Sequence, residues 1–192
     1  MDGGSRARRR RSSILHPPSS IFVVAALLVA AASPAAELRG SVVGVSDGDT
    51  ITVLDGAHQP RKVRLAGIDA PEMRQPYGTR AKQHLAALVF GKPVVVVWHK
   101  HDRYGRIVGH VLLPVPGDCG RLDCARLEDA GLAQIESGLA WHYRRYQAEQ
   151  TPAERGRYAR AELEARTRRE GLWNDTDPIP PWVFRNPRSR PG

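Results

Sequence analysis

The stretch "VSDGDTITV", from Val45 to Val53, carries two aspartates on either side of one glycine, followed by a run in which polar and apolar residues alternate. The alternation predicts a β-strand, and "DGD" predicts the tight turn before it. Asp47 is expected to stabilise this turn by accepting a hydrogen bond from the backbone that follows it. Asp49 opens the strand, where its carboxylate is available for other chemistry.

The pattern on either side of this hairpin predicts further strands and helices. Strands are expected at residues 39–45, 50–54, 61–68, 94–101 and 107–113, and helices at 79–90, 126–138 and 151–171. The last helix begins with Thr151, Pro152 and Glu154, which is typical of a capping box with proline in the first turn. Five strands with a helix after the third indicate an α+β fold: a five-stranded β-barrel of the oligonucleotide/oligosaccharide-binding (OB) type, capped by about three α-helices.

The composition favours an anionic partner. The chain has 192 residues, 29 Lys and Arg against 20 Asp and Glu, and a formal net charge of +9. A basic excess of this kind points to nucleic acid, a membrane surface or an acidic polymer. The hydrophobic fraction of 41% is slightly low for a globular protein but is not in the range of disordered proteins, and the length predicts one domain with additional segments.

The first 36 residues are predicted to form a signal peptide. Arginines clustered between residues 6 and 11 precede the uncharged apolar run "IFVVAALLVAAA", and small residues follow it up to Ala36. The apolar run is shorter than the ~20 residues that span a bilayer. We therefore expect an exported protein, secreted or periplasmic, that is cleaved near Ala36. The alternative is an uncleaved segment that anchors the protein in the membrane.

The remaining chain divides into a domain and a tail. Residues 37–173 are expected to form the folded domain, and the proline-rich residues 174–192 a C-terminal tail that folds poorly, although Trp182 could dock on the domain. Cys119 and Cys124 lie close together in "GDCGRLDC". In an exported protein such a pair predicts an intramolecular disulfide across a turn.

Charged side chains that could carry chemistry gather at the ends of the predicted strands. Carboxylates are supplied by Asp49, Asp69 and Glu72, and guanidinium groups by Arg64 and Arg106. Asp49 opens the second strand, Arg64 lies inside the third, and Asp69 ends it. Because neighbouring strands bring such positions together, we expect these side chains to converge on one site.

This set of groups suits the hydrolysis of a phosphodiester. Two neighbouring carboxylates, Asp49 and Asp69, repel each other unless a hard divalent cation binds both, and the Ala70 carbonyl could add a third oxygen. Calcium tolerates an irregular oxygen site better than magnesium does. Arg64 and Arg106 can each bind a phosphate, and Glu72 can orient or deprotonate a water molecule.

Five short motifs occur in an order that resembles the staphylococcal nuclease (thermonuclease) family. They are "DGDT" at Asp47, "RLAGIDAPE" at Arg64, "YGR" at Tyr104, "GLA" at Gly138 and "GLW" at Gly171. Each motif alone is weak, but five in register are specific. The resemblance covers most of the chain from Leu38 to Trp173.

The resemblance implies a Ca²⁺-dependent endonuclease that cuts DNA and RNA and leaves the phosphate on the 3′ side. By motif, calcium would be bound by Asp49, Asp69 and the Ala70 carbonyl; Arg64, Glu72 and Arg106 would be catalytic; and Tyr104 would contact the substrate. We expect DNA and RNA, preferably single-stranded or frayed, as the partners of a monomer that needs no other protein. The alternative is a non-catalytic OB-fold module that binds nucleic acid, either free or anchored in a membrane.

The sequence departs from the family pattern in three places. One is the aromatic stretch after "GLA", so the nucleotide-stacking tyrosines of the family are not carried over to this sequence, and the other two lie near the site. Ala70 stands where the founding member has threonine, although only the carbonyl of this residue is needed. The loop from Glu72 to Tyr77 is shorter than in the founding member, which could change access to the site.

Overall fold

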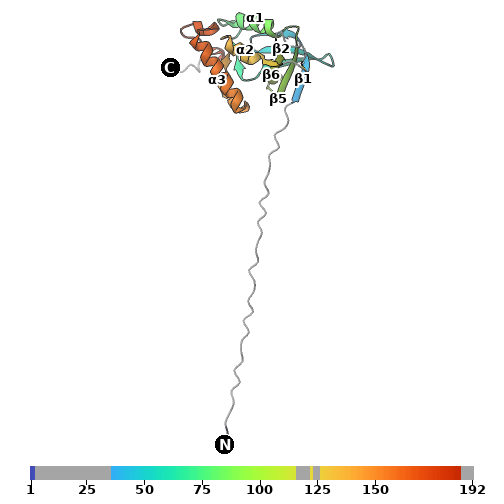
Figure 1. Ribbon diagram of the computed structural model, residues 1–192, viewed down its shortest axis with the longest axis vertical. Coiled ribbons are helices and arrows are strands. Elements are labelled where there is room, and N and C mark those ends of the chain that lie inside the picture. The colour runs from blue at the N-terminus through green and yellow to red at the C-terminus, as the bar shows by residue number, and fades with distance from the viewer. Residues whose placement is uncertain (3–35, 116–121, 123–125, 187–192) are drawn as a thin grey trace. The chain divides into compact units, whose positions relative to one another are not determined.

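The computed structural model describes residues 1–2, 36–115, 122 and 126–186 (Figure 1). The folded domain lies within Ser33–Gly192, the larger of the two units into which the chain divides. Both cysteines lie outside the described part, as do residues 187–192. Of the predicted signal peptide, only residues 1, 2 and 36 are described. No helix in that part is both long and apolar enough to span a membrane.

A closed five-stranded barrel forms the centre of the domain, as predicted. Its strands are β1 (Ala36–Val45), β2 (Thr50–Asp55), β3 (Pro60–Leu65), β5 (Pro93–His101) and β6 (Ile107–Pro114). They pair in the order β3-β2-β1-β5-β6, and a parallel pairing of β3 with β6 closes the barrel. The fold is therefore the α+β, OB-type barrel that the pattern predicts.

Helices cover this barrel. They are α1 (Gly78–Val89), α2 (Ala130–Glu136), α3 (Pro152–Thr167) and α4 (Pro181–Arg185), with two 3₁₀ turns, η1 (Arg144–Glu149) and η2 (Gly171–Asn174). The capping box predicted for α3 is present: Glu154 N donates to Thr151 Oγ1 (3.2 Å), and Thr151 N donates to Glu154 Oε2 (2.7 Å). In Figure 1, α3 lies on one side of the domain and β1 with β5 on the other.

The core fills the barrel and continues beneath the helices. From the strands it takes β-branched and leucine side chains, including Ile51, Val53, Val63, Leu65, Val96 and Val111. On α1, Ala81, Leu85 and Val89 lie on one face and are buried, and Leu88 is partly buried. A second, smaller cluster joins Trp141 to Trp173 and to Trp182 of α4.

The third predicted strand is divided into two strands in the structure. The third strand was expected to run to Ile68, but β3 ends at Leu65 because Gly67 adopts a left-handed backbone (φ 74°) and turns the chain. Ile68 and Asp69 then form a separate strand, β4, which pairs with β8 (Trp141–His142). This turn moves Asp69 from the barrel sheet to a second, two-stranded sheet.

The helix expected from residue 126 begins later. Residues Leu127–Asp129 form β7 and pair with β6, and α2 starts at Ala130. Asp129 ends the strand and caps the helix, since its Oδ1 accepts hydrogen bonds from the backbone of Gly131 (2.8 Å) and Leu132 (3.4 Å). The tail that was expected to fold poorly also contains structure, because α4 packs on the domain through Trp182.

Candidate active site

The turn before β2 fixes the backbone at the centre of the site. Asp47 Oδ1 accepts a hydrogen bond from Asp49 N (3.0 Å), which confirms the predicted turn role of Asp47. Burial, together with the charge of Asp49, raises the pKa of Asp47 to about 6. The buried side chain of Gln134, in α2, ties this turn to α1 by donating to the carbonyls of Gly48 (2.7 Å) and Ala81 (3.0 Å).

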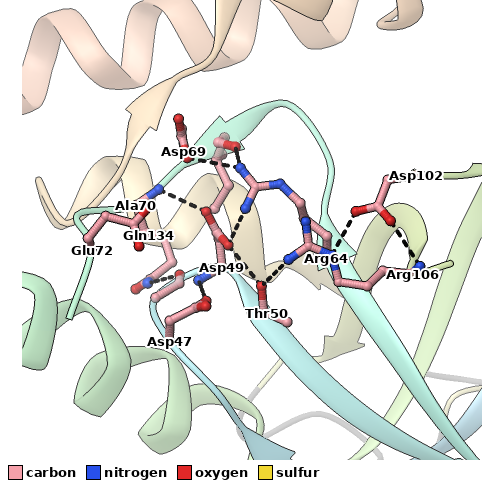
Figure 2. Close-up of polar contacts among 12 residues, drawn as sticks. Asp47, Asp49, Thr50, Arg64, Asp69, Ala70, Glu72, Asp102, Arg106 and Gln134 are labelled. Carbon is pink, nitrogen blue, oxygen red and sulfur yellow. Dashed lines mark hydrogen bonds and ion pairs between the residues drawn. The ribbon is translucent and has the colours of Figure 1, made fainter. Parts of the chain in front are cut away.

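Arg64 bridges the two predicted metal-binding carboxylates (Figure 2). Its Nη1 lies 2.5 Å from Asp49 Oδ1, and its Nη2 lies 2.9 Å from Asp69 Oδ1. Burial opposes the charge of this guanidinium, but Asp49 and Asp69 outweigh burial and raise the pKa of Arg64. The register explains the meeting, because Arg64 pairs directly with Thr50, the neighbour of Asp49, across β2 and β3.

Asp69 is fully buried and is held by a second arginine that the sequence analysis did not single out. Arg185 Nη2 lies 2.6 Å from Asp69 Oδ2, and Arg185 Nη1 lies 3.1 Å from Asp69 Oδ1. The same Nη1 lies 2.7 Å from Glu72 Oε1. Burial raises the pKa of Asp69 even though Arg185 acts to lower it. α4 therefore contributes directly to the site.

The short loop between Asp69 and α1 presents Glu72 at the rim. The Glu72 side chain is 36% exposed, whereas Asp69 is covered. Glu72 N donates to Gln75 Oε1 (3.2 Å), and Gln75 N donates to the Glu72 carbonyl (2.8 Å). Gln75 Nε2 also donates to the carbonyl of Ile179, just before α4. The loop and the C-terminal segment thus hold each other in position.

Arg106 joins the cluster from the turn between β5 and β6. Asp102 Oδ2 accepts from Arg106 Nε (2.7 Å), and Asp102 Oδ1 accepts from the backbone of Tyr104 (2.9 Å) and Arg106 (3.0 Å). Arg106 Nη1 reaches Thr50 Oγ1 at 3.4 Å, and Thr50 in turn bonds to Asp49 Oδ1. The Tyr104 ring is 69% exposed, with the Arg106 guanidinium 5.5 Å from its centre.

The carboxylate oxygens of Asp49 and Asp69 are the type of ligand that a hard cation binds. Asp49 and Asp69 are both buried, both supply carboxylate oxygens, and both are neutralised here by guanidinium groups. The backbone N–H of Ala70 donates to Asp49 Oδ2 (3.0 Å), so Ala70 lies beside the same carboxylate. Within the described residues, no three His, Cys, Asp or Glu side chains form a metal cluster. A cation would therefore need backbone or water oxygens in addition to the two carboxylates.

The predicted residues thus form one connected network. Figure 2 shows its central part, which runs from Asp69 through Arg64, Asp49 and Thr50 to Arg106. Glu72 joins it through Arg185, and Tyr104 is exposed beside Arg106. Sequence reasoning missed Thr50, Asp102, Gln134 and Arg185. "DRYGR" contained a signal for Asp102, since an aspartate before a turn accepts local backbone hydrogen bonds. For Arg185 the only signal was the neighbouring Trp182.

Comparison with known proteins identifies relatives along most of the chain. A family model described as "Staphylococcal nuclease homologue" matches residues 62–175. A micrococcal nuclease of Shigella flexneri is 43% identical over 150 residues, which cover 78% of this chain and 82% of that protein. An uncharacterised endonuclease of Escherichia coli is 38% identical over 152 residues, covering 79% and 87% respectively. The staphylococcal-like nuclease CAN1 of Arabidopsis thaliana is 36% identical over 124 residues, covering 65% of this chain and 33% of that protein.

Proposed function

Because the chain belongs to the staphylococcal nuclease family and is a nuclease acting on nucleic acids, we propose that it is a Ca²⁺-dependent endonuclease that cuts DNA and RNA and leaves 3′-phosphates. Nucleases of this family are in general metal-dependent. The observation that carries the proposal is the buried Asp49–Arg64–Asp69 bridge, with Glu72 exposed beside it. This arrangement combines charge compensation with a carboxylate that water can reach.

The cation site consists of the Asp49 and Asp69 carboxylates and the Ala70 carbonyl. A calcium ion held by these groups would supply positive charge to the phosphate. Calcium is favoured over magnesium because two carboxylates and one carbonyl do not form a rigid octahedral set. Both carboxylates already lie against guanidinium groups, which supports their need for a positive partner.

Each charged side chain has one role in the reaction. Glu72 accepts a proton from the attacking water, whose oxygen bonds to phosphorus. Arg64 and Arg106 donate to the phosphoryl oxygens, where negative charge grows in the transition state. The bond from phosphorus to the 5′ oxygen breaks, that oxygen takes a proton from solvent water and leaves as a hydroxyl, and the phosphate stays on the 3′ side. Glu72 returns the proton it accepted to solvent, which restores the starting state.

The function is tested with purified protein on DNA and RNA. Cleavage is expected with calcium, little with magnesium, and none after chelation. The ends of the products are then analysed: a 3′-phosphate blocks primer extension until a phosphatase removes it. Equal rates in magnesium and calcium would contradict the choice of metal, and extendable ends would contradict the cleavage position.

We also propose that the protein is exported. The N-terminal pattern supports signal-peptide cleavage near Ala36, and β1 begins at that residue. Cys119 and Cys124 would then form a disulfide in an oxidising compartment. Mass spectrometry of the exported protein should find an N-terminus at or near Glu37 and a mass two hydrogens below that of the reduced form. Full-length protein in the cytoplasm, with both thiols free to react with an alkylating agent, would contradict export and disulfide together.

A further inference from the structure

A cleft of about 360 Å³ lies beside the site described above, and that site does not use it. Its aromatic wall is formed by Trp141, Tyr143 and Trp182. The Trp141 and Trp182 rings meet edge to face with centres 5.5 Å apart, and the Tyr143 and Trp182 rings lie 5.3 Å apart with planes tilted by 33°. Tyr143 and Trp182 are only partly buried, so a flat ligand can reach their rings.

Two connections link this cleft to the Asp69 end of the site. Trp141 pairs directly with Asp69 across β8 and β4, and directly opposed residues on antiparallel strands point to the same face. α4 contributes Trp182 to the cleft and Arg185 to the carboxylates of Asp69 and Glu72. Tyr104, by contrast, lies next to Arg106, at the other end of the network. The cleft is therefore a separate aromatic surface.

The charge of the cleft favours an anion. Glu162 is buried and forms ion pairs with Arg144 (2.9 Å) and Arg166 (3.5 Å). The Arg166 guanidinium also lies 5.2 Å from the centre of the Trp141 ring. Arg145 lines the same cleft and is exposed. Three guanidinium groups against one carboxylate leave a positive surface next to the aromatic wall.

We propose that this cleft binds one unstacked nucleotide of the substrate strand, directly beside the scissile phosphate. The inference rests on the proposed nuclease function and states how part of the nucleic-acid substrate is bound. Its base stacks on Trp182 and Tyr143, and its phosphate pairs with Arg145. Base–aromatic stacking tolerates any sequence, and the volume of the cleft lies in the range of small-ligand sites. Since only an unstacked base can enter, the cleft favours single-stranded or frayed nucleic acid.

The test measures binding separately from cleavage. Wild type and Trp182→Ala are titrated in chelator, at fixed ionic strength, with a fluorescent thymidine hexanucleotide and with a hexamer of abasic deoxyribose phosphates. Wild type should bind the thymidine strand more tightly than the abasic strand. Trp182→Ala should lose about tenfold in affinity for the thymidine strand. Its affinity for the abasic strand should stay near that of wild type.

Control variants separate stacking and charge from a change in fold. Trp182→Phe keeps a ring on α4 and should recover most of the affinity. Arg145→Glu should weaken binding to both strands, whereas Arg160→Glu, an equal charge reversal at an exposed position on α3 outside the cleft, should weaken it much less. Circular dichroism and melting temperature verify that each variant folds.

Two results would overturn the inference. One is a folded Trp182→Ala variant with the affinity of wild type for the thymidine strand. The other is an equal loss on both strands, because a stacking contact cannot act on a strand without bases. Either result leaves the proposed nuclease function standing. If the protein does not cut nucleic acid but still binds the thymidine strand more tightly in a way that depends on Trp182, the proposed nuclease function is wrong and the proposed base-binding role of the cleft stands.

Discussion

Arg185 and Asp69 are 116 residues apart in sequence and form a two-point ion pair, with Nη2 2.6 Å from Oδ2 and Nη1 3.1 Å from Oδ1. The Arg185 guanidinium also binds Glu72. It therefore supplies positive charge to a proposed calcium ligand and to the proposed base at the same time. A cation that binds at Asp69 must share this carboxylate with Arg185 or displace it.

Arg185→Ala is expected to increase the affinity for calcium. Without this guanidinium, the negative charge on Asp69 and Glu72 is less compensated, which favours a bound cation and destabilises the metal-free protein. Because the Arg185 side chain is 42% exposed, solvent screens the pair, and we expect a change of at most about tenfold. Isothermal titration calorimetry with calcium alone, without nucleic acid, measures it.

Two variants serve as controls for this experiment. Arg185→Lys keeps the charge but loses the two-point geometry, so its affinity should lie between those of wild type and alanine. Arg168→Ala removes an exposed ion-paired arginine at the end of α3 and should leave calcium binding unchanged. An Arg185→Ala protein that binds calcium as wild type does would refute the competition.

Glu72→Gln is expected to slow cleavage at least about 100-fold with little loss of stability. The substitution removes the proton acceptor but keeps the size of a side chain that is 36% exposed. Single-turnover rates and melting temperatures should be compared with those of Glu164→Gln, an exposed acid on α3. A rate within a few-fold of wild type would remove Glu72 from the mechanism.

Arg64→Ala should differ from Glu72→Gln in its effect on stability. Arg64 is largely buried and lies between Asp49 and Asp69, so its removal leaves two buried carboxylates without this partner. Breaking a buried pair in this way costs about 3–5 kcal/mol. We expect loss of cleavage together with a clearly lower melting temperature, part of which calcium restores by binding the same carboxylates. A melting temperature unaffected by calcium would contradict a shared site.

The part of the site that lies on the barrel could be predicted from sequence. Alternation predicts β2 and β3 as neighbouring strands, which places Asp49, directly before β2, close to Arg64 of β3. A turn aspartate such as Asp47 accepts a hydrogen bond from the backbone two residues later. These contacts involve residues in the same turn or on adjacent strands, and the alternating pattern of a strand predicts them. The position of Asp69 was predicted as the end of one strand, but its place opposite Trp141 depends on the turn at Gly67.

The part of the site that α4 supplies could not be predicted. Arg185 lies in a proline-rich segment with no long periodic pattern, and its contact with Asp69 depends on how Trp182 packs against Trp141. Trp182 indicated that this segment could dock on the domain, but no local pattern indicates which side chain the docking brings to Asp69. The predicted start of α2 was wrong for a related reason. Residues 127–129 pair with β6, and this strand pairing outweighs the helical pattern of the sequence.

Gly78→Ala is expected to disturb Glu72 from a distance. A Cβ at Gly78, the first residue of α1, would overlap the backbone carbonyl of Glu72, so the loop must move. Overpacking against backbone typically costs about 1–3 kcal/mol, and a displacement of ~1 Å at a catalytic group can cost up to about 100-fold in rate. Gly156→Ala, with open space around its Cβ in α3, should keep full activity and gain slightly in stability. Wild-type cleavage by Gly78→Ala would show that the loop adapts.

The last prediction concerns pH and a group outside the active site. His110 Nδ1 lies 3.2 Å from Asp129 Oδ2, and His110 Nε2 lies 3.7 Å from Glu154 Oε1. Burial opposes protonation, as does the nearby Arg157, but Asp129 and Glu154 outweigh both and raise the pKa of His110. Burial also acts to raise the pKa of Asp129, but the hydrogen bonds it accepts from His110 and Tyr158 lower it, so Asp129 stays ionised in mild acid.

Because the pKa of His110 is higher in the folded protein than in the unfolded chain, the stabilisation that it gives must decrease as pH rises. The stabilisation from His110 is fully present below the unfolded pKa of about 6.5 and is lost as pH rises through the higher folded value. The free energy of unfolding of wild type, minus that of His110→Gln, should therefore be largest near pH ~5.5 and should shrink above neutrality. Denaturant titrations at a series of pH values measure this difference, with the exposed His58→Gln as the control. A difference that is constant with pH would mean that His110 contributes by packing alone, and one that grows as pH rises would mean that burial, and not Asp129, controls its protonation.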